Sequence, residues 1–144
     1  MPVSVTTRGC RAPSLAARLA RSGRRLLAGL RRPDAELSVV LVSDRMIRTL
    51  NRRWRGKDRA TDVLSFSQLE GDGRAPVDLL GDVVISVPTA RRQARERGES
   101  LAREGERLLI HGLLHLLGYD HERSAAEAAR MRRREAALAR LLEH

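Results

Sequence analysis

Residues 111–121 read HGLLHLLGYDH and bring three histidines into one short apolar segment. His111 and His115 are four residues apart, so on a helix their side chains share one face, with Cβ atoms about 5–6 Å apart. Gly118 is expected to end the helix in a left-handed conformation, which lets His121 turn back toward the other two. The helix must be largely buried, because its axis is surrounded by Leu109, Ile110, Leu113, Leu116 and Leu117. The segment therefore predicts three imidazoles that converge at the end of a buried helix.

The chemistry of the three histidines favours a bound metal. Three neutral imidazoles with a fourth position left open are the ligand set of a catalytic zinc ion, whereas structural zinc sites are usually closed and rich in cysteine. The chain has one cysteine, Cys10, far away in sequence. We therefore predict one zinc ion held by His111, His115 and His121. The alternative is that these are ordinary helix histidines satisfied by hydrogen bonds.

The histidine spacing also matches the H-x-x-x-H-x-x-G-x-x-H pattern of a large class of zinc peptidases. Those enzymes need a glutamate directly after the first histidine as general base. Here that position is Gly112. The pattern therefore predicts a metal site without predicting peptidase chemistry.

Length and composition favour one folded domain. The chain has 144 residues, of which 42% are hydrophobic, so it can bury a real core as a single unit, residues 1–144. No apolar run approaches the roughly 18–20 residues that span a bilayer, so we expect a soluble protein with no membrane partner. A lone cysteine cannot form an intramolecular disulfide and gives no sign of an oxidising compartment.

The net charge of +10 indicates a polyanionic partner, because clustered cations release counterions from phosphates. Lys57 is the only lysine. Such exclusive use of arginine could also reflect coding bias, so local clusters carry more information than the total charge. An aromatic content of 2% argues against a platform that stacks many bases.

The first 33 residues allow two interpretations. They contain eight arginines and no acidic residue, which is also typical of an organelle transit peptide. We prefer a short strand around Val3 and Val5, followed by a helix that begins near Pro13. The buried face of that helix would carry Leu15, Leu19, Leu26 and Leu30.

Three further strands are expected. Residues 37–42 are so continuously apolar that the strand is covered on both faces, and residues 63–67 and 80–86 form the others. Residues 69–78 contain two glycines and a proline and are expected to form a flexible, hairpin-like connection. Together these segments predict an α/β domain whose sheet has about four strands.

Helices are predicted between and after these strands. Capping residues and helix breakers place them after Ser43 or Asp44, from Pro88 to Gly98, from Ser100 through the histidines, and from the capping box Ser124–Glu127 onward. The last helix can pack on the body of the domain through Met131, Leu138 and Leu142.

Residues 51–62 are expected to form a loop of unusual character. Five cations surround one aromatic residue there: Arg52, Arg53, Arg55, Lys57 and Arg59 around Trp54. The functional interpretation is a surface that grips phosphates and stacks a base. The alternative is a solvated helix end whose cations interact favourably with the helix dipole.

Four blocks of the chain occur in the order of one known family: Asn51 with residues 54–57, then 61–66, 80–86 and 111–121. On these blocks, from about residue 36 to 135, the chain resembles the YbeY family of bacterial zinc-dependent endoribonucleases, which act in ribosomal RNA maturation. The resemblance implies an α/β fold with a mixed sheet of about four strands, zinc on the three histidines, and a catalytic Arg55 in a cleft. Trp54 occupies a position where tyrosine is more usual.

The resemblance raises the question of the general base. Without a glutamate after His111, hydrolysis must rely on water that zinc acidifies to a pKa of about 7, or on another base nearby. Asp120 is the nearest candidate, and its alternative role is to orient a metal-bound histidine. Arg55 has a clear task, because a guanidinium can grip two phosphate oxygens and stabilise transition-state charge.

The leading hypothesis is a zinc-dependent, single-strand-type endoribonuclease acting on ribosomal RNA, in a single metal-dependent hydrolase domain. A zinc peptidase or amidase, and a non-catalytic, zinc-braced RNA-binding assembly factor, are the alternatives. The resemblance further suggests small ribosomal subunit proteins and assembly GTPases as partners, and a location in the bacterial cytoplasm.

Overall fold

The protein is described by a computed structural model that covers residues 3–67 and 78–143. Its elements follow the order β1 Val3–Arg8, α1 Pro13–Gly29, β2 Glu36–Val42, α2 Asp44–Arg55, β3 Val63–Ser67, β4 Leu79–Ser86, α3 Val87–Arg97, α4 Leu101–Leu116 and α5 Ala125–Leu141. The expected α/β class is therefore confirmed. The predicted connection over residues 69–78 lies, except for Asp78, outside the described residues.

The four strands form one mixed sheet in the order β1-β2-β4-β3. Strands β1, β2 and β4 are parallel, and β3 pairs antiparallel with β4 at the edge. In the middle of the sheet, Val39 on β2 pairs with Val5 on β1 and with Val83 on β4. The mixed four-stranded sheet is the one that the sequence and its family resemblance predict.

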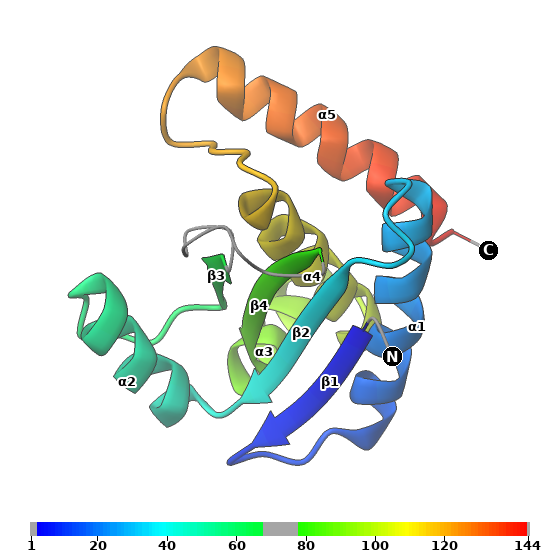
Figure 1. Ribbon diagram of the computed structural model, residues 1–144. Helices are drawn as coiled ribbons and strands as arrows, with labels where there is room; N and C mark the ends of the chain where they lie inside the picture. Colours follow the sequence, from blue (N-terminus) through cyan, green and yellow to red (C-terminus); the bar gives the residue numbers. More distant parts are fainter. Residues whose placement is uncertain (1–2, 68–77, 144) are drawn as a thin grey trace.

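Helices cover the two faces of the sheet unequally. Figure 1 shows α3 and α4 behind the sheet, α1 beside them at the right, α5 across the ends of α4 and α1, and α2 at the other side. The main core lies between the sheet and the helices α1, α3 and α4, where Leu19, Leu109 and Leu113 are fully buried. A smaller cluster of Val42, Ile47 and Val84 lies under α2. As a result, α4 is the central buried helix that the sequence predicts.

The N-terminal segment forms a strand and a helix, as preferred from sequence. Strand β1 pairs with β2, and α1 starts at Pro13 in its first turn, where a proline needs no backbone N–H. Leu15, Leu19 and Leu26 are buried as expected, and Leu30 lies just past the helix end and is partly buried. Among the described residues, no helix is long and apolar enough to cross a membrane.

The predicted loop over residues 51–62 is wrong in its first half. Helix α2 continues to Arg55, and Gly56 ends it in a left-handed conformation with φ +71°. Arginine is a good helix former, so the cations continue the helix rather than breaking it. Asn51 is buried in the last turn, and its side-chain Nδ2 donates to the carbonyl oxygen of Arg59 at 3.0 Å. This bond folds residues 56–59 back against the helix end.

Candidate metal centre

The three histidines meet at the C-terminal end of α4. His111 and His115 lie one turn apart on the helix, with ring centroids 4.7 Å apart. Gly118 adopts φ +96° just after the helix end, and the reversed chain carries His121 back to within 5.3 Å of His115, centroid to centroid. One nitrogen from each ring lies within 4.8 Å of the others. The convergence predicted from the histidine spacing is confirmed.

The nitrogen positions fit a shared metal ion. Nε2 of His111 and Nε2 of His115 are 3.2 Å apart. Two imidazole nitrogens on one tetrahedral zinc, each about 2.0–2.1 Å from the ion, would be separated by about 3.3 Å. A hydrogen bond between the two rings accounts for one pair of histidines but leaves the approach of His121 unexplained. The three side chains are therefore compatible with a metal site.

The protonation state of His115 also suits a metal ligand. Burial lowers the pKa of this imidazole, and the neighbouring His111 and His121 lower it further, while Asp120 and Glu122 act in the opposite direction. The neutral form, which is the form that binds metals, is therefore favoured at His115. His121 is the most open of the three, with a side chain that is 43% exposed. The centre thus has one side accessible to solvent.

A carboxylate that the sequence analysis missed contacts the centre. Oε2 of Glu135, on α5, lies 3.2 Å from Nδ1 of His111. The signal was present in the sequence, because Glu135 follows the buried Met131 by four residues and so lies on the inner face of its helix. An acidic residue on an inner helix face needs a partner, and here that partner is a candidate metal ligand.

Gly112 explains why the general base of zinc peptidases is missing. A Cβ atom at this position would lie 2.7 Å from Cγ1 of Val83 on β4 and 3.1 Å from Oγ of Ser65 on β3. The residue after the first histidine therefore faces the sheet at contact distance. A glutamate there would have no space and would point away from the histidines.

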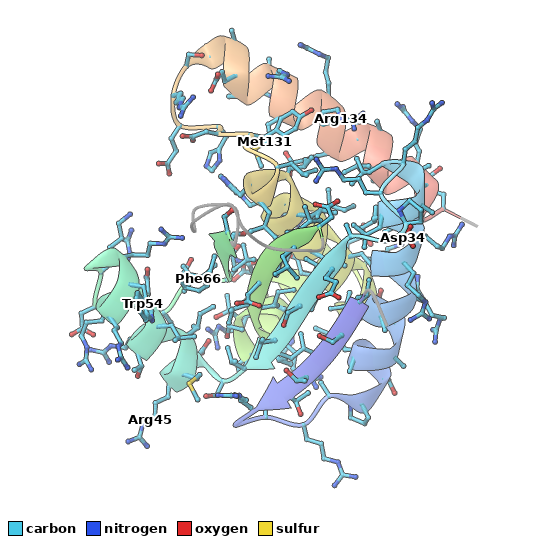
Figure 2. The ribbon with its side chains drawn as sticks, in the orientation of Figure 1. Asp34, Arg45, Trp54, Phe66, Met131 and Arg134 are labelled. Carbon is cyan, nitrogen blue, oxygen red and sulfur yellow. The ribbon has the colours of Figure 1, made fainter. Side chains whose placement is uncertain are left out.

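Arg55 is connected to α4 through β3. Its Nη2 donates to the backbone carbonyl of Ser65, and its guanidinium carbon lies 5.1 Å from the ring centroid of Phe66. The Oγ of Ser65 in turn donates to the carbonyl of Gly112 at 2.9 Å. Figure 2 shows Phe66 between β3 and α2. Arg55 is the last residue of α2. The structure thus anchors Arg55 on the strand that packs against α4.

The other four cations of the segment and Trp54 form a separate, exposed surface, which we call the basic flank: Arg52, Arg53, Trp54, Lys57 and Arg59. Trp54 is 61% exposed, and the guanidinium carbon of Arg53 lies 5.5 Å from its ring centroid. Asp58 sits within this surface but pairs with Arg48, from whose Nε its Oδ1 accepts at 2.9 Å. The flank therefore keeps a net positive charge around one exposed aromatic ring.

Asp120 holds the loop that carries His121. Its Oδ1 accepts a hydrogen bond from the backbone N–H of Glu122 at 2.8 Å, and its Oδ2 lies 3.6 Å from Nε of Arg123. The contact forms a turn between Asp120 and Glu122, the residues directly before and after His121. The negative charge of Asp120 also raises the pKa of His115, whereas burial lowers it.

Comparison with known proteins identifies the family. A family model described as Endoribonuclease YbeY matches residues 18–143. The chain belongs to the YbeY family. The Endoribonuclease YbeY of Anaeromyxobacter sp. (strain Fw109-5) is 56% identical over 140 residues, covering 97% of this chain and 71% of that protein. The Endoribonuclease YbeY of Geobacter sulfurreducens is 47% identical over 146 residues, covering 100% of this chain and 97% of that protein.

A solved structure shares the fold of this chain. The solution structure of TM1509 from Thermotoga maritima superimposes with a TM-score of 0.69 at 28% sequence identity, covering 96% of this chain and 87% of that one. The YbeY resemblance drawn from the sequence blocks and the α/β fold are both confirmed. The YbeY match includes the three histidines, Arg55 and Glu135, and it begins within α1.

Proposed function

We propose that this protein is a zinc-dependent, single-strand-type endoribonuclease that acts in ribosomal RNA processing and ribosome maturation. Membership of the YbeY family confirms the expected enzyme class, because the relatives are named endoribonucleases. The observation that carries the finer proposal is the convergence of three histidine nitrogens within 4.8 Å of one another. Bound there, zinc would supply Lewis-acid chemistry and lower the pKa of water.

The donor set supports zinc rather than a hard cation. His111, His115 and His121 offer three imidazole nitrogens, which suit zinc, whereas calcium and magnesium prefer oxygen ligands. Three protein ligands leave a tetrahedral ion one open position, as in catalytic zinc sites. The side chain of His121 is 43% exposed, which supports an open position that faces solvent, where a large polymer can reach it.

Arg55 is proposed as the catalytic cation. Its hydrogen bond to Ser65 and its position over Phe66 hold the guanidinium in place, and its remaining N–H groups are available to phosphate oxygens. A cation already in position stabilises the charge that a phosphodiester gains in the transition state without reorganisation at the moment of reaction. Asp120 is proposed to act beside His121, either by accepting a proton or, as its bond to Glu122 favours, by holding the ligand loop.

The basic flank is proposed to bind the RNA chain outside the reacting bond. Arg52, Arg53, Lys57 and Arg59 are exposed and can contact phosphates, and Trp54 offers a face on which one unpaired base can stack. Stacking of this kind needs an unpaired base, which supports a single-stranded segment as substrate. Ribosomal RNA, small ribosomal subunit proteins, assembly GTPases and a location in the bacterial cytoplasm belong to this proposal through the family resemblance.

Cleavage of a structured ribosomal RNA fragment by the zinc-loaded protein tests the proposal. His115→Ala, purified in the same way, reveals any contaminating nuclease. We expect the wild type to cut and the variant to be inactive. Equal cleavage by both proteins, or by neither, would contradict the enzymatic proposal and favour the non-catalytic assembly factor.

A further inference from the structure

Glu135 lies on the face of α5 that packs against α4. Met131, one turn earlier, is fully buried, and Leu138 is 2% exposed. Figure 2 shows Met131 between α5 and the end of α4. The side chain of Glu135 is 28% exposed, close to the 25% of His111, its hydrogen-bond partner. A carboxylate placed along this inner face is held by packing on both sides, so its position is defined by the helix contact.

The hydrogen bond determines which nitrogen of His111 carries the proton. A neutral imidazole has one N–H group, and a carboxylate can only accept. With Oε2 of Glu135 at 3.2 Å from Nδ1, the proton belongs on Nδ1. Nε2 of the same ring then keeps its lone pair. That Nε2 is the atom that lies 3.2 Å from Nε2 of His115, inside the group of converging nitrogens.

A competing partner for Glu135 is Arg107, whose charge lies nearby. The pKa of Arg107 is raised first by its hydrogen bond to Glu104, and in smaller part by the negative charge of Glu135. The guanidinium of Arg107, however, donates to Glu104 and Gln93. In the part of the chain that the structure describes, the hydrogen bond of Glu135 is the one to His111. Arg107 therefore adds a favourable charge without engaging the carboxylate directly.

We propose that Glu135 is the positioning residue of the metal centre. It accepts the Nδ1–H of His111, and so fixes both the tautomer and the orientation of the ring with Nε2 facing the metal. This inference rests on the metal site proposed above and extends it from three ligands on one helix end to a contact with α5. Carboxylates that hold metal-bound histidines in this way commonly contribute 10–100-fold in metal affinity or activity.

Metal affinity of three variants tests the role. Zinc or cobalt(II) binding is measured by competition with a chromogenic chelator for wild type, Glu135→Ala, Glu135→Gln and Glu143→Gln. We expect Glu135→Ala to bind metal about 10–100-fold more weakly. Glu135→Gln should recover most of the affinity, because the amide oxygen can still accept from Nδ1–H. Glu143 is exposed just beyond α5 and controls for loss of one negative charge, so Glu143→Gln should bind as wild type does.

The tautomer gives a readout independent of metal and RNA. In nitrogen-15 NMR of the metal-free wild type, His111 should populate the Nδ1–H form, and Glu135→Ala should show a mixture of both forms. If Glu135→Ala folds poorly, Glu135→Gln and the wild-type tautomer still decide. An Nε2–H form in the wild type, or affinity of Glu135→Ala within about twofold of wild type, would overturn the positioning role alone. Failure of the wild type to bind metal would overturn the metal site itself.

Discussion

His111 is held by contacts that come from three directions. Along its own helix it stands one turn from His115, across the fold it meets Glu135, and its neighbour Gly112 presses against the sheet. The helix sets the position of the ring, and the hydrogen bond to Glu135 selects its tautomer. The contact of Gly112 with the sheet sets the distance between α4 and the strands. Contacts of single residues therefore set the position of this proposed metal ligand within the protein.

Proton competition gives a prediction at His115. Metal ligands must be neutral, so zinc affinity should fall as the pH drops below about 6.5, the ordinary pKa of histidine. Because burial and the other two histidines lower the pKa of His115, this side chain stays neutral to a lower pH than an ordinary histidine. We expect affinity to decline progressively from pH 7 to 5, measured by chelator competition. A flat profile over that range would argue against a three-histidine site.

Arg55 and the basic flank should respond differently to substitution. Arg55→Ala should mainly slow turnover, because its guanidinium is proposed to act on the transition state, whereas Arg52→Ala or Arg53→Ala should mainly weaken RNA binding in a salt-sensitive way. Single-turnover cleavage rates and binding titrations at two salt concentrations separate the effects.

Arg55→Lys is the matched control for the charge at this position. Lysine keeps the charge but lacks the planar fork that can contact Ser65 and a phosphate together, so it should restore little activity. Equal losses in binding and rate for Arg55→Ala and Arg52→Ala would remove Arg55 from the catalytic assignment.

At the level of elements, the close approach of α4 to the sheet determines where the site can form. Gly112 lets the helix backbone lie against Val83 on β4 and Ser65 on β3. The same approach brings the carbonyl of Gly112 within reach of the Ser65 hydroxyl, and the backbone carbonyl of Ser65 holds Arg55. One small residue on α4 therefore links the position of the proposed metal ligands to that of the proposed catalytic cation.

Gly112→Ala tests this packing. The added Cβ would lie 2.7 Å from Cγ1 of Val83, so helix and strand must separate. We expect a loss of about 1–3 kcal/mol in the free energy of unfolding, typical of overpacking, together with weaker metal binding. Urea denaturation and chelator competition measure the two effects.

A double-mutant cycle with Val83→Ala provides the control. Removing the two γ-methyl groups makes room for the new Cβ, so Gly112→Ala should cost less in the Val83→Ala background than in the wild type. Additive costs would show that the destabilisation has another origin, such as a change at Ser65.

Across the whole molecule, the candidate metal centre brings together residues from α4, from the turn after it and from α5. Two ligands come from α4, the third from the turn after it, and the proposed positioning carboxylate from α5. That turn, residues 117–124, has few buried side chains of its own. A bound metal would therefore cross-link the end of α4 to the chain that leads into α5.

Metal removal should consequently lower global stability. A ligand that binds only the folded state at one hundred times its Kd adds about 2.7 kcal/mol, which for a domain of this size raises Tm by about 5–10 °C. Calorimetry with excess zinc and with chelator measures the shift, and hydrogen exchange should show protection concentrated in residues 117–124. Identical Tm values in both conditions would contradict metal binding by the folded protein.

Sequence patterns predicted most elements correctly because their causes are local. Strand alternation, serine caps at Ser43, Ser100 and Ser124, and glycine ends at Gly98 and Gly118 all act within a few residues. The loop expected at residues 51–55 was wrong, because arginine has a high helix propensity and these residues continue α2. The burial of Asn51 and its bond to Arg59 could not be read from composition.

The sequence by itself determined the convergence of the three histidines. A helix repeats every 3.6 residues, so the first two histidines share one face, and a glycine in the left-handed conformation reverses the chain toward the third. Only the tertiary structure decided that Glu135 meets His111 and that Arg55 reaches α4 through Ser65. Those pairs are far apart in sequence, so their distances depend on how α5 and β3 pack on α4. That packing is set by side-chain volumes throughout the core rather than by any local pattern.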